Sequence, residues 1–310
     1  MNKRYTAIIS TISNSFCDFT LDYAINKYNM YKVLAFTTLL ATLGQLIIGL
    51  IIGIKLTLVS LPFILLYGVI ILGGYILYVK SLKIMPIGLT GLIESGDLFI
   101  ILLIDIMLGY ITLTPKFIIL FIIFIISIFI FSIETNRINI EKKESLVKRI
   151  INFITFKKKE KKIIKRVTIK GLILILSSML LYCLEPYLIK IASNFGANEI
   201  AINLGYYIFG TTYFISKYLK SKNNNISITR EFNRKFLLIC IAIAIFETIY
   251  YFFATISYMN DIPIIVCIIQ EIRIFLLVIL SVIFKTDKMS LKKVVAILMA
   301  MISVSLLYFS

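Results

Sequence analysis

The sequence predicts an all-α membrane protein with ten transmembrane helices, arranged as two inverted five-helix repeats. The chain has 310 residues, of which 60% are hydrophobic, and its mean hydropathy is +0.97. A soluble globular domain is closer to half apolar. Apolar runs of about 20 residues, long enough to cross the hydrocarbon core of a bilayer, recur along the chain. Residues 62–132 and 237–310 also share one pattern: two long apolar runs, a short polar gap and a third run.

Ten apolar runs account for most of the chain, and short loops separate most of them. The first run is rich in Ser, Thr, Asn and Asp and is followed by no small-residue cleavage site, so we expect a retained span and not a signal peptide. No stretch remains that could form a soluble catalytic domain. We expect transmembrane helices at residues 6–25, 34–54, 62–79, 87–108, 117–133, 171–191, 199–219, 236–256, 262–284 and 292–309.

The internal repeat is marked by two Pro–Glu pairs. Pro86 and Glu94 are eight residues apart, as are Pro263 and Glu271, and the pairs superpose at one offset of 177. Five spans per half is an odd number, so the second half must enter the bilayer upside down relative to the first. Repeats of this kind build secondary transporters whose substrate site lies between the halves. We therefore divide the chain into a first repeat (1–136), a connecting loop (137–168) and a second repeat (169–310).

The composition excludes several classes of function. The chain has no His, and its four Cys residues lack CxxC spacing, so we expect small packing residues and no metal site or cofactor. No glycine-rich phosphate loop is present, which argues against ATP hydrolysis. Without His or a nucleophile beside a base, an enzyme is not expected.

The net charge of +17 is concentrated in the central loop. Residues 137–166 hold twelve of the 33 Lys and Arg, and residues 145–156 carry apolar positions at helical spacing. We expect the segment 145–166 to lie on anionic lipid and not to bind nucleic acid, with a solvated basic linker as the alternative. The positive-inside rule places this loop in the cytoplasm.

Span 4 carries three acidic residues on one helical face. Glu94, Asp97 and Asp105 fall within about 80° of one another at 100° per residue. Charged side chains at membrane depth are costly unless they are paired or hydrated. We therefore expect this stripe to face a hydrated cavity, with Glu94 or Asp97 in the site.

Span 9 contains Arg273 and Glu271, and we expect Glu271 to take part in proton or cation binding with Glu94 and Glu185. Glu271 and Arg273 lie on different faces of a helix, so Arg273 is expected to reach a carboxylate on another span, for which Glu94 and Asp97 are the candidates. The repeat brings spans 4 and 9 face to face. The alternative role for Arg273 is to clamp a substrate carboxylate.

Span 6 contains Glu185 next to Pro186, which should kink the helix because proline lacks a backbone donor. Glu185 is therefore a candidate for proton or cation binding, and Asp18 lies in the corresponding region of span 1. Glu247 is a weaker candidate. Acids outnumber bases within the spans, which favours cations or protons over phosphate-bearing substrates. Eight tyrosines could add cation–π surface, although we expect most of them to pack between helices: Tyr67, Tyr75, Tyr78, Tyr182, Tyr206, Tyr207, Tyr250 and Tyr251.

Two stretches carry a family resemblance: YILYVKSLKIMPIGLTGLIES…MLGYITLT and YFFATISYMNDIPIIVCIIQE…FKTDKMS. Together with the five-plus-five spans, they make nearly the whole chain resemble the drug/metabolite transporter superfamily, specifically its EamA-type ten-span members. The resemblance implies transport by alternating access. It also implies the membrane orientation opposite to that of the charge count.

These observations predict a multi-pass integral membrane protein, in the cell membrane if the source is prokaryotic. The predicted function is secondary-active, proton-coupled export of a small metabolite or organic cation. The alternatives are an amino-acid exporter or facilitator, which would use Arg273 for the substrate carboxylate, and a non-transporting membrane scaffold. A monomer is compatible with this function.

Overall fold

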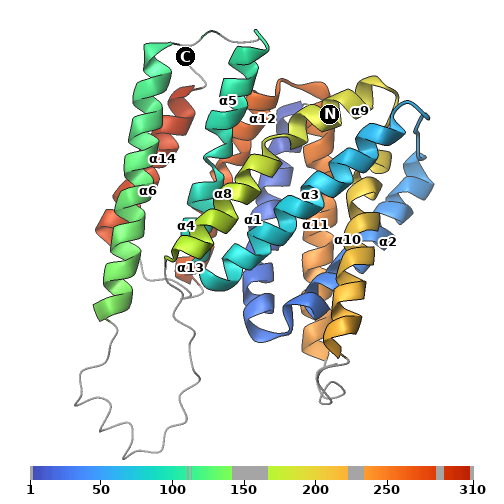
Figure 1. Ribbon diagram of the computed structural model, residues 1–310, viewed down its shortest axis with the longest axis horizontal. Helices are drawn as coiled ribbons and strands as arrows, with labels where there is room; N and C mark the ends of the chain where they lie inside the picture. Colours follow the sequence, from blue (N-terminus) through green and yellow to red (C-terminus); the bar gives the residue numbers. More distant parts are fainter. Residues whose placement is uncertain are drawn as a thin grey trace, which may run out of the picture.

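The computed structural model describes residues 3–109, 112, 114–141, 167–222, 234–283 and 290–307. The described chain forms helices and contains no strand (Figure 1). The basic segment 145–166, with its predicted lipid contact, lies outside the described residues. The helices are α1 (Lys3–Lys27), α2 (Met30–Ile52), α3 (Leu61–Ile84), α4 (Ile87–Glu94), α5 (Asp97–Met107), α6 (Pro115–Glu141), α8 (Ile169–Tyr182), α9 (Glu185–Asn194), α10 (Glu199–Lys222), α11 (Arg234–Asn260), α12 (Pro263–Gln270), α13 (Ile272–Ile283) and α14 (Leu291–Leu307).

All ten predicted ranges fall on these helices, but only seven segments of the described chain are by themselves long and apolar enough to cross a membrane. The helices α1 and α10 are more polar, and the described part of α14 has only 17 residues. The chain therefore has the helices of a multi-pass membrane protein. The seven segments are Met30–Ile52, Leu61–Ile84, Ile87–Met107, Pro115–Thr135, Ile169–Asn194, Arg234–Asn260 and Pro263–Leu280.

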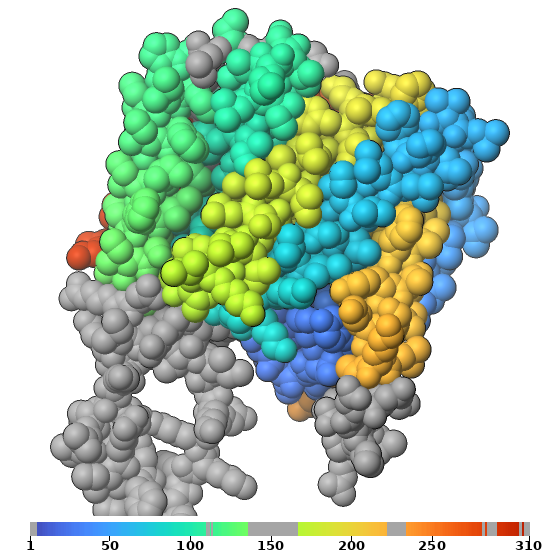
Figure 2. Space-filling view, viewed as in Figure 1, coloured from blue at the N-terminus to red at the C-terminus, as the bar shows by residue number. Residues whose placement is uncertain are grey.

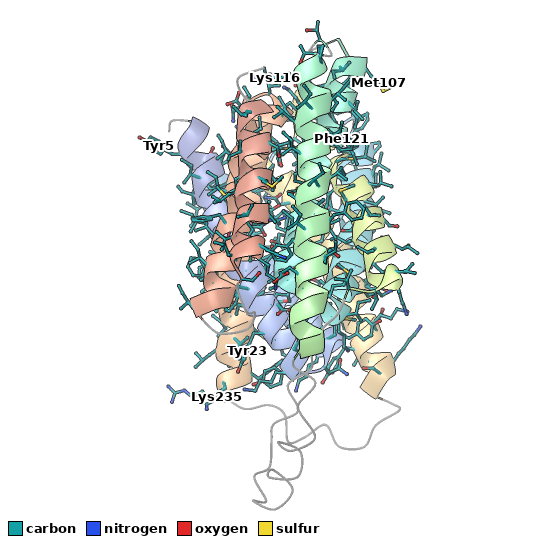
Figure 3. The ribbon with its side chains drawn as sticks, turned by 90° about the vertical axis from the view of Figure 1, so that its left-hand side faces the viewer. Tyr5, Tyr23, Met107, Lys116, Phe121 and Lys235 are labelled. Carbon is teal, nitrogen blue, oxygen red and sulfur yellow. The ribbon has the colours of Figure 1, made fainter. Side chains whose placement is uncertain are left out.

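The distribution of polarity is the reverse of that in a soluble protein. Large apolar side chains lie on the outside, such as Leu50 at 85% exposed and Met107 at 86%. Acidic side chains lie inside. Figure 3 shows side chains projecting from the bundle along its length, with Lys116 near one end and Lys235 near the other. An apolar surface of this extent suits contact with lipid chains, and lysines at the ends can reach the polar headgroups.

Three of the predicted spans are interrupted helices. The break in span 6 at Cys183–Leu184 agrees with the kink expected from Pro186. Spans 4 and 9 are also interrupted, so the angles calculated for a single straight helix do not hold across these breaks. The chain turns at Ser95–Gly96, where the Gly96 amide bonds the Ile93 carbonyl in a tight i→i+3 turn. It turns again at Glu271, whose carbonyl accepts from the amide of Ile274.

Each break places a carboxylate at the start of the next helix. Asp97 is the first residue of α5, Glu185 is the first residue of α9, and Glu271 immediately precedes α13. A helix N-terminus carries a partial positive charge, so an acidic residue is favourable there. The breaks therefore explain how three acidic residues are accommodated inside the bundle.

The helices pack in pairs that join the two halves of the chain. The main pairs are α1 with α11, α2 with α10, α6 with α14, and α3 with both α8 and α10. In Figure 2, α8 and α3 run side by side as diagonal ridges across one face. Gly68 of α3 meets Gly205 of α10, and a Cβ atom added at Gly68 would lie 2.5 Å from the Gly205 carbonyl oxygen. Small residues allow this close approach of the two helices.

Hydrogen bonds also connect two loops at one end of the bundle. The amide of Lys55 donates to Asn198 Oδ1 at 3.1 Å, and the amide of Asn198 donates to the Lys55 carbonyl at 3.0 Å. Asn198 Nδ2 donates to the Gly53 carbonyl at 2.8 Å, and the Thr57 hydroxyl donates to the Phe195 carbonyl. We call these four bonds the loop clasp. It ties the loop before α3 to the loop before α10.

Candidate functional site

A central cavity with a volume of about 60 Å³ lies between the helices of the bundle. A cavity of this size and polarity has room for a few water molecules. All six residues predicted for the site line this cavity, although they come from four separate predicted spans. The charged side chains of its wall are Asp18, Glu94, Asp97, Glu185, Glu247, Glu271 and Arg273, and its tyrosines are Tyr75, Tyr78, Tyr182, Tyr250, Tyr251 and Tyr258.

Arg273 of α13 is bonded to two carboxylates from the first half of the chain. Its Nη2 atom lies 2.7 Å from Glu94 Oε2, and its Nη1 atom lies 3.3 Å from Asp18 Oδ2. The expectation that Arg273 reaches a carboxylate on another span is confirmed for Glu94. The second partner, Asp18, was not predicted. Charge-assisted hydrogen bonds of this kind are among the stronger ones in proteins.

Two of the other four carboxylates accept hydrogen bonds from tyrosines, and a third has an unbonded oxygen. The Tyr67 hydroxyl donates to Glu185 Oε1 at 3.4 Å, and the Tyr206 hydroxyl donates to Glu247 Oε1 at 3.2 Å. Asp97 Oδ1 is buried without a hydrogen-bond partner among the described residues. Two of the six carboxylates thus share the one guanidinium of the described wall.

Asp105 does not belong to this site. The prediction placed it on one face with Glu94 and Asp97, toward a common cavity. In the structure Asp105 is fully buried elsewhere, and the Tyr187 hydroxyl of α9 donates to its Oδ1 atom at 2.7 Å. The angular argument assumed one continuous helix, and the break at Ser95–Gly96 removes that assumption.

Glu247 and five of the tyrosines line the cavity, although the sequence analysis treated Glu247 as a weaker candidate and most of the tyrosines as packing residues. Glu247 is 2% exposed and lines the cavity. Of the eight tyrosines expected mainly to pack between helices, Tyr67, Tyr206 and Tyr207 lie behind the wall, but the other five line it. The spacing of these five tyrosines in the sequence did not predict that they line one cavity, because the wall is formed by several separate helices.

The site has no arrangement suited to a bound metal ion. Among the described residues, no group of three or more His, Cys, Asp or Glu side chains has a suitable geometry. The wall can bind positive charge through its carboxylates, donate hydrogen bonds from its tyrosines, and present aromatic faces to a cation.

Comparisons with known proteins bear on the fold. No protein-family model matches the chain, and no curated protein sequence matches it. A solved structure, described only as the crystal structure of a protein, is similar over almost the full length. The alignment covers 99% of this chain and 98% of the other, with a TM-score of 0.64 and 13% sequence identity. At this identity the similarity shows a shared fold and nothing about function.

Proposed function

We propose that this chain is a secondary-active transporter that exports a small organic cation by alternating access, coupled to protons. The observation that carries the proposal is the central cavity, whose described wall holds six carboxyl groups and one guanidinium. Interrupted helices line it, and discontinuous transmembrane helices are typical of substrate sites in secondary transporters.

The proposal includes ten membrane-spanning helices in two inverted repeats. The packing of the helices supports this symmetry. In the repeat, α1 corresponds to α8, α2 to α10, α3 to α11 and α6 to α14. The contact between α1 and α11 therefore has its counterpart in the contact between α8 and α3, and the contact between α3 and α10 has its counterpart between α11 and α2. The α2–α10 and α6–α14 pairs map onto themselves. In addition, α1 begins at the end of the bundle where the described part of α14 finishes, as an even number of crossings requires (Figure 1). The same arrangement supports membership of the drug/metabolite transporter superfamily as part of the proposal.

The arrangement around Arg273 favours a cation over an amino acid. An amino-acid substrate would need a free guanidinium for its carboxylate. Arg273 is already bonded to Glu94 and Asp18, so a substrate carboxylate would have to displace one of them. A cation, in contrast, finds Asp97, Glu185, Glu247 and Glu271 in the wall without a basic partner in the described wall.

Coupling to protons follows from competition for the same groups. A buried carboxylate is neutralised either by a proton or by a bound cation, and leaving it charged and unpaired is costly. Binding of one therefore favours release of the other. Glu185 is the residue proposed for this exchange, because it starts α9 at a helix break and accepts its hydrogen bond from the neutral Tyr67 hydroxyl.

The proposal is tested by measuring currents from proteoliposomes on a solid-supported membrane. The panel consists of tetramethylammonium, tert-butylammonium and neutral amino acids, each applied with and without a pH gradient. Protein-free liposomes correct for passive permeation of the amine. We expect a cation current that the pH gradient increases and that Glu185→Gln abolishes. Glu199→Gln removes a carboxylate outside the cavity wall and should leave the current unchanged.

Other outcomes would change the assignment. Current from amino acids alone, lost in Arg273→Gln, would favour the amino-acid exporter. Absence of current from correctly folded protein across the panel would refute the cation transporter and favour a scaffold.

A further inference from the structure

Glu247 of α11 has a carboxylate oxygen that the protein leaves unbonded. Its side chain lines the cavity although the residue is only 2% exposed. The Oε1 atom accepts the hydrogen bond from Tyr206, whereas Oε2 has no hydrogen-bond partner in the part of the chain that the structure describes. Arg273 is bonded to Asp18 and Glu94 instead.

A second unbonded oxygen belongs to Tyr75 of α3. Tyr75 is buried and lines the same cavity, and its hydroxyl likewise lacks a partner within the described ranges. Tyr75 and Glu247 are both neighbours of Tyr206, which bonds Glu247 through its hydroxyl and packs against the Tyr75 ring. Buried polar atoms in native proteins are almost always bonded, and leaving one unbonded is unfavourable. We therefore expect a group from outside the chain to bond both oxygens.

Aromatic rings surround this part of the cavity. The Tyr75 and Tyr206 rings are nearly perpendicular, with centroids 6.0 Å apart, and the Tyr206 and Tyr251 rings lie 4.9 Å apart. Aromatic faces attract cations. A carboxylate within a group of aromatic rings is thus suited to a compact positive group.

We propose that Glu247 and Tyr75 bind the ammonium head of a primary amine. The inference rests on the proposed function and names the substrate class for that cavity. Two N–H groups of the ammonium donate to Glu247 Oε2 and to the Tyr75 hydroxyl oxygen, and the rings of Tyr75 and Tyr251, which both line the cavity, flank the charge. A quaternary ammonium ion has no N–H group, so it leaves both oxygens unbonded. The site therefore selects for N–H donors and not for positive charge alone.

Two cations of nearly equal shape test this selectivity. Tert-butylammonium and tetramethylammonium both have five heavy atoms in a tetrahedral arrangement, but only the first carries N–H donors. Binding is measured on the purified full-length protein in detergent, by calorimetry and by the ligand-dependent rise of the unfolding midpoint. We expect tert-butylammonium to half-saturate the protein at a concentration at least about tenfold lower than tetramethylammonium, since a buried acceptor left unbonded disfavours the quaternary ion.

Matched variants locate the selectivity. Glu247→Gln should weaken tert-butylammonium binding by at least about tenfold, and Tyr75→Phe by roughly threefold to tenfold, because each removes one acceptor. Glu199→Gln and Tyr213→Phe make the same chemical changes at residues outside the cavity wall and should leave binding unchanged. If Glu247→Gln fails to fold, Tyr75→Phe, which deletes a single hydroxyl, decides the question.

Three results would overturn the inference: equal affinity for the two cations, binding unaffected by Glu247→Gln and Tyr75→Phe, or saturation by Na⁺ or K⁺ with no response to either organic cation. The binding measurement does not depend on transport. Selective binding without flux would refute the proposed function and leave this inference standing. Flux in a protein whose binding ignores Glu247 and Tyr75 would refute this inference alone.

Discussion

Replacing Arg273 with glutamine should destabilise the protein by about 3–5 kcal/mol, the range measured when one partner of a buried ion pair is removed. The Arg273 side chain is 13% exposed, and each of its two acidic partners is 6% exposed. Two unit charges about 4 Å apart attract by about 4 kcal/mol at an effective dielectric constant of about 20. The variant loses this attraction twice and leaves two carboxylates without a counter-charge, but it also removes the desolvation cost of the buried guanidinium, so the net loss is smaller than the summed attraction. Glu94, at 2.7 Å, should account for the larger share.

Equilibrium unfolding in mixed detergent micelles measures this loss. The loss of stability in Arg273→Gln should become smaller as the pH falls, because protonation neutralises the two unpaired carboxylates. Adding Glu94→Gln to Arg273→Gln should recover part of the loss, with an interaction energy of about 0.5–3 kcal/mol in the double-mutant cycle. Lys235→Gln removes a positive charge from an exposed helix end and should change stability by less than about 0.5 kcal/mol. A loss in Arg273→Gln no larger than that of Lys235→Gln would refute the reasoning.

Two other contacts give measurable effects. Gly68→Ala should cost about 1–3 kcal/mol of stability, since the new methyl group would lie 2.5 Å from the Gly205 carbonyl oxygen. Gly210→Ala, whose nearest neighbours would lie 3.8 Å away, should be neutral or slightly stabilising; equal effects of the two changes would contradict the close helix approach. Tyr187→Phe should cost about 1–3 kcal/mol by leaving Asp105 without its donor. Cation affinity should stay unchanged in that variant, and a weakened affinity would return Asp105 to the site.

The helices and part of the site could be predicted from single residues and their spacing. Each apolar run lies on one helix or on a pair of consecutive helices of the described chain. The free-energy cost of an isolated charge within a span pointed to Glu94, Glu185 and Arg273. The partner of Arg273 followed from the repeat. Asp18 was not predicted as its second partner, because which residues of α1 face α13 depends on how the whole bundle packs.

The helix breaks account for most of what could not be predicted. Proline marked the break before Glu185, but spans 4 and 9 contain no proline near Ser95 or Glu271. Tertiary packing therefore interrupts helices whose local sequence would allow them to continue. The error at Asp105 follows directly, since helical angles cannot be summed across a break. Glu247 was a weaker site candidate because it is a single acidic residue in a long apolar run, without a charged residue close to it in the sequence.

The loop clasp has a mechanical consequence. Its four hydrogen bonds join Lys55, Thr57 and Gly53 of the first half to Asn198 and Phe195 of the second, all at one end of the bundle. Transport by alternating access requires the halves to rock against each other. Because the clasp resists separation of this end, we expect this end of the bundle to stay closed while the opposite end opens. In the proposed transport cycle, a cross-link between positions 55 and 198 should then permit the opposite end to open and block only the opening of the clasp end.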